Sequence, residues 1–322
     1  MRKALFALSA FSLAALLTGC DDSSTSVPDT PDPTSSETIG TISSGSEEVL
    51  SSAAEEITSS ASVEISSASV ESSASVSVPL AVVPDEDGFY DIADIYKAAP
   101  ATSKIVFVIR HAEREDDLGQ LSNLTEDGSA QARALGAKLV SEESFYYGST
   151  DFVRTRATAN CIAEGRGEVA TVDTLDEILD GNYFVSVPSD SFDAYTKKHG
   201  GSWTFVSRWA YNDTVSANPA VTESLKLAYA TYFYDLFERG NQFVTENIVA
   251  NVPNWSRVSF LVTHDVLVAP LIIYVSNREV DLQFFASRRW ANYLSGIAVV
   301  IDEAGDVLLY PVRGAETGYM YP

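Results

Sequence analysis

The sequence predicts an α/β fold, a three-layer sandwich in which helices cover both faces of a mostly parallel central sheet. Residues 105–109 and 258–262 are runs of mostly apolar side chains, the pattern of strands buried on both faces. Stretches with helical spacing of apolar residues alternate with these runs. Residues 296–300 and 307–312 flank an Asp-Glu-Ala-Gly-Asp turn, so the sheet is expected to end in an antiparallel hairpin.

The first twenty residues have the features of an export signal. Arg2 and Lys3 precede an apolar run at residues 4–17, which is too short for a standard membrane span and has the length of a signal peptide. The Leu-Thr-Gly-Cys that follows resembles the lipobox of bacterial lipoproteins, in which the cysteine becomes the lipidated N-terminus. We therefore expect residues 1–20 to be a lipoprotein signal peptide. Lipidated Cys20 would hold the protein on a bacterial membrane, extracytoplasmically, in the periplasm or at the cell surface.

Residues 21–88 have the composition of a disordered, acidic tether. Ser, Thr, Ala, Val, Glu and Pro dominate there, and such a segment buries too little apolar surface to fold. Residues 21–96 contain 16 acidic residues and no Lys or Arg, in a chain whose formal net charge is −24. This charge argues against nucleic acid as a partner, because phosphate backbones require cationic surfaces.

Residues 89–322 are expected to form one folded domain, whose elements follow from apolar periodicity and capping residues. The first expected elements are a short helix at 92–97, the strand at 105–109, a helix capped by Thr125, a strand at 145–149, a helix within 151–164 and a strand at 169–172. A cap insertion at 182–221 comes next, and then a long helix at 222–249, the strand at 258–262, a helix at 266–274 and the hairpin.

Charged side chains stand where the predicted strands end. Arg110 and His111 directly follow the first apolar run, Arg154 follows a shorter one, and His264 follows residues 258–262. Sheets of this class bind ligands beside the C-terminal ends of their strands. Because a guanidinium presents a planar fork of donors that matches phosphate or carboxylate, this edge is predicted to bind an anion rather than a metal.

Four motifs, in this order, resemble the histidine phosphatase superfamily, which holds phosphoglycerate mutases and many acid phosphatases. They are the strand followed by Arg110-His111, the helix opening Leu-Thr-x-x-Gly-x-x-Gln-Ala-x-x-Leu-Gly at residues 124–136, Arg-Thr-x-x-Thr-Ala at residues 154–159, and the late strand followed by His264. The resemblance covers roughly residues 100 to 312. It implies that residues 89–322 are a catalytic domain that needs no metal and no other cofactor.

The resemblance also implies a role for each of these residues. His111 would be the nucleophile that forms a phosphohistidine, and Arg110 and Arg154 would bind the phosphoryl oxygens. His264, cationic beside bound phosphate, would donate a further hydrogen bond. One departure stands beside the nucleophile, where this chain has Ala112 in place of the glycine of many mutase-like members.

The sequence leaves the proton donor open between two carboxyl groups. The family places a glutamate acid in a Leu-x-Glu-x-x-x-Gly segment, which fits Leu175, Glu177 and Gly181. Its acid-phosphatase branch instead uses the aspartate of a His-Asp pair, which fits Asp265. Glu113 is a more distant third alternative.

The function expected from the resemblance is an anchored extracytoplasmic phosphatase that hydrolyses monoesters of phosphorylated small molecules. Export favours hydrolysis over mutase activity. The alternatives are a non-catalytic surface lipoprotein that binds an anion or another ligand on the same fold, and a phosphotransferase or mutase. The aromatic and cationic residues of the cap insertion fit either a lid that grips the leaving group or a locally packed subdomain.

Overall fold

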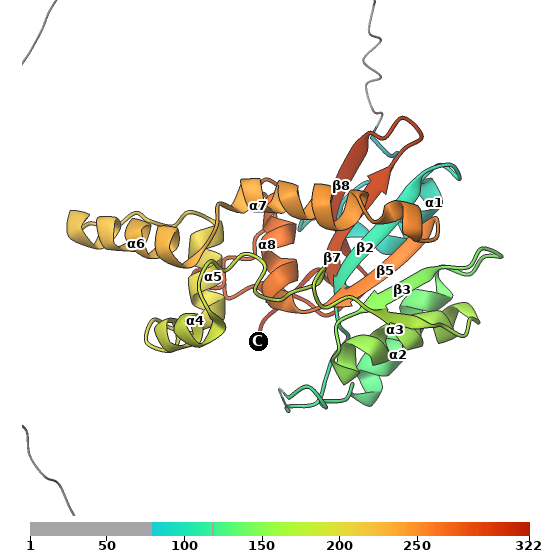
Figure 1. The fold of residues 1–322 in the computed structure, drawn as a ribbon, viewed down its shortest axis with the longest axis horizontal. Helices are drawn as coiled ribbons and strands as arrows, with labels where there is room; N and C mark the ends of the chain where they lie inside the picture. Colours follow the sequence, from blue (N-terminus) through green and yellow to red (C-terminus); the bar gives the residue numbers. More distant parts are fainter. Residues whose placement is uncertain (1–78, 118) are drawn as a thin grey trace, which may run out of the picture. The chain divides into compact units, whose positions relative to one another are not determined.

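A seven-stranded sheet of order β1-β8-β7-β2-β5-β3-β4 forms the centre of the structure (Figure 1). This computed structural model describes residues 79–117 and 119–322, which belong to one structural unit. The strands of the sheet are β1 (Tyr90–Asp91), β2 (Lys104–Arg110), β3 (Tyr146–Ser149), β4 (Val172–Thr174), β5 (Val258–Thr263), β7 (Ser295–Ile301) and β8 (Val307–Arg313). A separate pair is formed by β6 (Trp290–Ala291) and β9 (Tyr319–Met320).

Most neighbouring strands of the sheet are parallel, as predicted. β2 pairs in parallel with β5, β5 with β3, and β3 with β4, while β7 is antiparallel to both β2 and β8. The predicted terminal hairpin is therefore present as β7 and β8. Because four adjacent strands run in one direction, their C-terminal ends lie along a single edge of the sheet.

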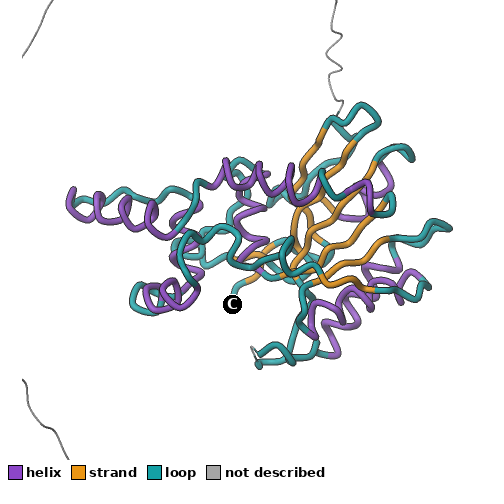
Figure 2. The backbone as a smooth tube through the Cα atoms, in the orientation of Figure 1, coloured by secondary structure: helices purple, strands orange, loops and turns teal. Residues whose placement is uncertain are grey.

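Strand β2 is buried on both faces, which explains its continuous apolar sequence. Ile105, Phe107 and Ile109 face one apolar cluster, whereas Val106 and Val108 face another. Helices pack on both sides of the strands, as the tube drawing also shows (Figure 2). The first side holds α1 (Ile92–Ala98), α2 (Glu126–Ala137) and α3 (Val153–Arg166), and the second holds α7 (Leu236–Gln242) and α8 (Asp265–Val275).

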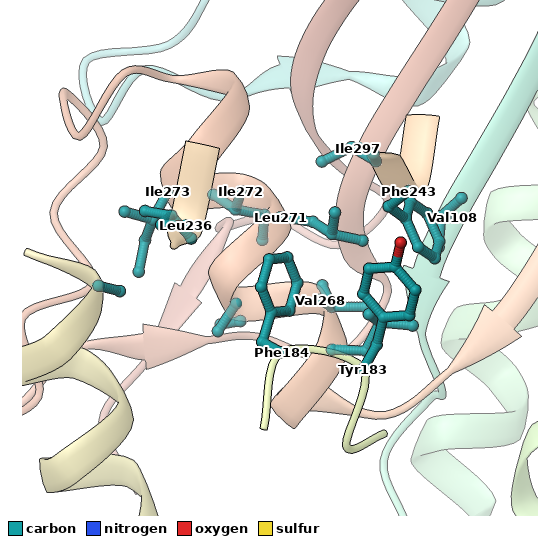
Figure 3. Packing of buried hydrophobic residues seen from close by; sticks show 14 of the residues in the cluster. Val108, Tyr183, Phe184, Leu236, Phe243, Val268, Leu271, Ile272, Ile273 and Ile297 are labelled. Carbon is teal, nitrogen blue, oxygen red and sulfur yellow. The ribbon is translucent and has the colours of Figure 1, made fainter. Parts of the chain in front are cut away.

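Helix α8 connects the sheet to the insertion. Val268 and Leu271 lie close to Val108 and Ile297 of the strands, and Phe184 of the insertion packs nearby (Figure 3). All five side chains are at most 2% exposed. The N-terminus of α8, which follows His264, is therefore fixed by a continuous apolar core.

Helices α2 and α3 pack at very close range because a glycine of each helix faces the backbone of the other. A Cβ atom at Gly136 would lie 2.0 Å from the Ile162 carbonyl oxygen, and one at Gly165 would lie 2.0 Å from that of Arg133. Only a residue without a side chain fits at such a distance. This contact fixes α3, whose first turn carries Arg154.

The insertion is larger than residues 182–221 and is helical. It contains α4 (Ser189–Thr196), α5 (Ser202–Ala210) and α6 (Pro219–Tyr232), which lie together on the left of Figure 1. Its two ends are joined by main-chain hydrogen bonds, from Tyr234 N to Phe184 O (3.1 Å) and from Ser186 N to Tyr232 O (2.9 Å). The part of the predicted long helix up to Tyr232 therefore belongs to the insertion.

The predicted single helix at 222–249 is wrong in its continuity. Phe233 has an extended backbone (φ −132°, ψ 152°), and α7 begins after Asp235, whose side chain accepts hydrogen bonds from the amides of Phe237 and Glu238. A π-helix, Phe243–Val249, continues α7. The break has no Gly or Pro; the buried Phe233 ring stacks on Trp209 with centroids 4.2 Å apart, a tertiary contact that periodicity does not reveal.

Two boundaries also differ from the prediction. The strand expected at 169–172 begins only at Val172, as β4. Val169, which was expected to lie in the strand, is fully exposed. The folded part begins before residue 89: Leu80 N donates to the Tyr310 hydroxyl (3.0 Å), and Asp85 pairs with Arg313 (2.6 Å).

Cys161 is buried, as expected for a core residue. The predicted signal peptide, Cys20 and most of the predicted tether lie outside the described residues. Among residues 79–117 and 119–322, no helix is long and apolar enough to cross a bilayer.

Candidate active site

Four of the predicted site residues lie together at the C-terminal edge of the parallel strands: Arg110, His111, Arg154 and His264. His111 follows β2, and its amide donates to the carbonyl oxygen of Thr263 at the end of β5 (3.0 Å). His264 is the N-cap residue of α8, and its ring lies edge to face with that of His111, with centroids 5.5 Å apart. Arg154 reaches the same place from α3, since its Nη2 lies 3.5 Å from His264 Nδ1.

His111 is held as a neutral imidazole by a hydrogen bond at its Nδ1. It is 3% exposed, and its Nδ1 lies 2.7 Å from the carbonyl oxygen of Ala112. A carbonyl only accepts, so Nδ1 carries the proton and Nε2 keeps its lone pair. Burial, together with the charge of Arg110, holds the pKa of His111 well below its ordinary value of 6.5. The ring is therefore unprotonated at neutral pH, and its Nε2 lone pair can attack an electrophile.

In the absence of a bound anion, His264 is neutral as well. Burial and the neighbouring charge of Arg154 lower its pKa from 6.5 to about 4. Arg154 only donates, so Nδ1 of His264 accepts and Nε2–H donates to the Thr150 hydroxyl (3.3 Å). The expected cationic form of His264 therefore requires the negative charge of a bound phosphate group to raise its pKa.

Arg110 is 3% exposed, and its guanidinium makes contacts at both terminal nitrogens and on its face. Its Nη1 donates to the carbonyl oxygen of Ala291 (2.6 Å) and lies 3.2 Å from the Met320 sulfur. Its Nη2 lies 3.6 Å from a carboxylate oxygen of Asp265. The Tyr293 ring covers the guanidinium at 4.2 Å, a cation–π contact. These contacts fix the plane of the guanidinium.

Arg154 is 7% exposed and is held from the loop after β2. Its Nη1 donates to the carbonyl oxygen of Gly119 (2.8 Å), and its guanidinium lies over the Phe152 ring at 4.3 Å. Burial and the charge of Arg114 lower the pKa of Arg154. Cations are thus gathered at this edge at an electrostatic cost, which a bound anion would relieve.

Two buried donors of the site lack an acceptor. Arg110 Nε and Arg154 Nε make no hydrogen bond with the described residues. A buried unpaired donor costs about 1–3 kcal/mol, more when the group is charged. Two unpaired N–H donors beside an imidazole with a free lone pair are expected where a protein binds and stabilises an oxyanion.

Comparison with known proteins identifies the family. A model of the histidine phosphatase superfamily (branch 1) matches residues 106–295, more than half of the chain. The chain belongs to this superfamily. No curated protein matches the sequence.

Several solved structures are similar to this chain. A phosphoglycerate mutase from Bacillus anthracis str. Sterne is 16% identical, with 66% of this chain and 93% of that chain covered and a TM-score of 0.41. A mycobacterial glucosyl-3-phosphoglycerate phosphatase is 18% identical, with 66% and 100% covered and a TM-score of 0.40. A protein histidine phosphatase complexed with tungstate is 13% identical, with 65% and 97% covered and a TM-score of 0.33.

Glu177, a candidate acid of this histidine phosphatase domain, lies on an exposed turn after β4. The segment is fixed to the site edge, because the Thr263 hydroxyl donates to the carbonyl oxygen of Leu179 (3.0 Å). A Cβ atom at Gly181 would lie 3.2 Å from Val266 at the start of α8. The turn therefore packs against the segment that carries His264, with the Glu177 carboxylate accessible to solvent.

Asp265, the alternative acid, is held as a carboxylate. It accepts a hydrogen bond from Trp290 Nε1 (2.9 Å), and its side chain is 14% exposed. Burial raises its pKa, but the charge of Arg110, the Trp290 hydrogen bond and the two neighbouring histidines together outweigh burial, so the net shift is downward. A group that stays ionised suits an electrostatic role better than proton donation. Glu113, the third alternative, is near the Thr125 hydroxyl (3.3 Å) at the start of α2.

Several site residues escaped the sequence analysis. Ala291 and Tyr293 contact Arg110, and Tyr293 also lies 5.8 Å from the His111 ring. Thr158 accepts from the Ala112 amide (2.9 Å) and donates to the Arg154 carbonyl (2.7 Å), so it joins the loop after β2 to α3. Thr158 is the second threonine of the Arg-Thr-x-x-Thr-Ala motif, so this motif is the sequence feature from which its role could have been predicted.

Within residues 79–117 and 119–322, no group of three or more His, Cys, Asp or Glu side chains is placed to hold a metal ion.

Proposed function

We propose that this protein is a phosphatase that hydrolyses phosphate monoesters through a phosphohistidine on His111. The observation that carries the proposal is the neutral His111 imidazole, whose Nε2 keeps a lone pair beside two buried guanidiniums. The guanidiniums of Arg110 and Arg154 would bind the nonreacting phosphoryl oxygens. Removal of one such donor from an anion site costs about 3–4 kcal/mol in the transition state.

The reaction would proceed in two transfers. In the first, His111 Nε2 forms a bond to phosphorus while the bond from phosphorus to the ester oxygen breaks, and Glu177 gives its proton to the departing oxygen. In the second, the Glu177 carboxylate takes a proton from water. The water oxygen attacks phosphorus, the N–P bond breaks, and inorganic phosphate leaves.

His264 would act as a phosphate-dependent cation in this scheme. Its pKa of about 4 rises when the negative charge of the substrate enters, so proton uptake accompanies binding. The protonated ring then donates to a phosphoryl oxygen as charge builds up in the transition state.

The assignment of the acid to Glu177 follows from the two environments. Glu177 is exposed to solvent on the turn after β4, where water can reach it for the second transfer. Asp265 is paired with Arg110 and with the Trp290 indole, so protonation of Asp265 would remove the ion pair and weaken the hydrogen bond.

The test of this function is release of inorganic phosphate from a small aryl phosphate, measured in a chelator with a His111→Ala control. The proposal predicts release by the wild type alone. Release by both would place the activity elsewhere, and release by neither would favour the non-catalytic ligand-binding alternative. Transfer of the phosphoryl group to an added alcohol or sugar, in place of water, would favour a phosphotransferase.

We further propose that Cys20 carries a lipid anchor and that residues 21–78 tether the catalytic domain outside the cytoplasm. The support is the charged, apolar and Leu-Thr-Gly-Cys pattern of residues 1–20. A Cys20→Ala variant is expected to lose incorporation of labelled fatty acid and to leave the membrane fraction. Unchanged labelling would contradict the anchor.

A further inference from the structure

Trp290 is a fully buried aromatic residue whose one polar atom points at the candidate active site. Its side chain is 0% exposed, and its Nε1–H donates to Asp265 Oδ2 at 2.9 Å. The same oxygen lies 3.6 Å from Nη2 of Arg110. A buried indole requires an acceptor, but many neutral acceptors would satisfy it. Here the acceptor is the carboxylate that pairs with Arg110.

The neighbouring residue holds the other end of the same guanidinium. The carbonyl oxygen of Ala291 accepts from Arg110 Nη1 at 2.6 Å. Strand β6, which consists of Trp290 and Ala291, thus holds both terminal nitrogens of Arg110. Ala291 contacts Nη1 directly, and Trp290 acts on Nη2 through Asp265. With both ends held, the guanidinium cannot rotate, and its unpaired Nε has a fixed direction.

Trp290 also connects this arrangement to the insertion. Its ring stacks on that of Trp203 in α5, with centroids 5.7 Å apart and planes inclined by 26°. Phe284 meets both rings edge to face, at 5.5 Å from Trp203 and 6.3 Å from Trp290. A displacement of α5 would therefore act on Trp290 and, through Asp265, on Arg110.

We propose that Trp290 is a positioning residue: its indole N–H fixes Asp265 against Arg110, and its stack on Trp203 makes the phosphate affinity of the site depend on the insertion. This inference rests on the proposed function only in taking Arg110 as a phosphate ligand. It assigns Asp265 to orientation of Arg110 and gives the insertion a role in phosphate binding.

The experiment compares the full chain with Trp290→Phe, which retains a ring for the stack and removes the N–H donor. The readouts are calorimetric binding of inorganic phosphate and the separate values of kcat and KM for an aryl phosphate. We expect phosphate binding to weaken about tenfold, the equivalent of one charge-assisted hydrogen bond. Trp255→Phe is the matched control, because Trp255 is also a buried core tryptophan, stacks on Tyr146, and lies before the N-terminal end of β5, outside both the insertion and β6.

Asp265→Asn is the second variant, in case Trp290→Phe does not fold. It removes the charge that reaches Arg110 and leaves the aromatic stack intact, so the same loss of phosphate affinity is expected. In the double variant, the second substitution should add less than about twofold, because both break one chain of contacts. Fully additive losses would overturn the linkage between Trp290 and Asp265.

The insertion arm uses Trp203→Ala and Trp203→Phe. Loss of the stacked ring in Trp203→Ala should weaken phosphate binding, and Trp203→Phe should restore it. Equal phosphate affinity in all Trp203 variants would overturn the role of the insertion.

The outcomes separate this inference from the proposed function. If the wild type binds phosphate and both Trp290→Phe and Asp265→Asn bind it equally well, Trp290 is a core residue alone and the inference fails, whatever the activity. If the wild type binds phosphate without hydrolysing any ester, the proposed function fails while the binding comparison still decides the inference. If the wild type does not bind phosphate, both fail.

Discussion

The imidazole rings of His111 and His264 face each other edge to face, 5.5 Å apart, at the ends of adjacent parallel strands. Burial is the leading cause of the lowered pKa of each ring. Two neutral imidazoles therefore stand beside two cationic guanidiniums, with the carboxylate of Asp265 as a partial counter-charge to Arg110. A site of this kind gains most from a ligand with at least two negative charges, such as a phosphate monoester.

The lowered pKa of His264 predicts a pH dependence of stability. Between about pH 4 and 6.5, the unfolded chain binds a proton on His264 that the native state does not. The free energy of unfolding should therefore fall as the pH drops through this window, by up to roughly 2–3 kcal/mol from this residue, and be unaffected by it above pH 6.5. Urea titrations of the wild type and His264→Gln at several pH values measure the difference. Identical pH dependence of the two proteins would contradict the assignment.

Arg154→Met should separate activity from stability. Loss of the guanidinium should reduce kcat/KM for an aryl phosphate by about 100- to 1000-fold. The free energy of unfolding should stay equal or rise by about 1 kcal/mol, because the substitution removes a buried charge with an unpaired Nε. Arg133→Met, at an exposed arginine of α2, is the control and should retain full activity. A strongly destabilised Arg154→Met protein would show that this arginine serves the fold.

The proton donor can be identified by comparing substrates whose leaving groups differ in their need for a proton. Glu177→Gln should lower kcat by about 100-fold or more for alkyl phosphates, whose departing oxygen needs a proton. It should have little effect on aryl phosphates with acidic phenols. Asp265→Asn should affect both classes alike, because it disturbs Arg110. The reverse pattern would make Asp265 the acid.

The contacts of residues 80–85 predict that a chain starting at residue 79 is more stable than one starting at residue 89. The shorter chain loses the Asp85–Arg313 pair and the hydrogen bond from Leu80 to Tyr310. A loss of about 1–2 kcal/mol in the free energy of unfolding is expected for one half-buried pair and one hydrogen bond. Chemical denaturation of the two chains tests this. Equal denaturation midpoints would show that residues 79–88 do not contribute to the stability of the domain.

The sequence could predict the strands and the site edge because both depend on local pattern. A strand buried on both faces needs an uninterrupted apolar sequence, so Arg110 and His111 stood out directly after residues 105–109. His264 stood out after β5 for the same reason.

What the sequence did not reveal depends on distant contacts. Ala291 and Asp265 meet Arg110 only because β6 and α8 fold back onto the end of β2. Trp290 has no local feature that separates a core residue from one that donates to a carboxylate. The break between α6 and α7 likewise depends on Phe233, which is extended and buried by the insertion's own aromatic core. The tertiary burial, which sets the pKa values of His111 and His264, was equally hidden.

The most direct test of the account is to trap the phosphoenzyme. The protein would be mixed with an aryl phosphate, quenched in alkali within milliseconds, digested and examined by mass spectrometry. The account predicts one added phosphoryl group on the peptide that contains His111, with none in His111→Ala. Phosphate release without any phosphohistidine, or a phosphoryl group on another residue, would contradict it.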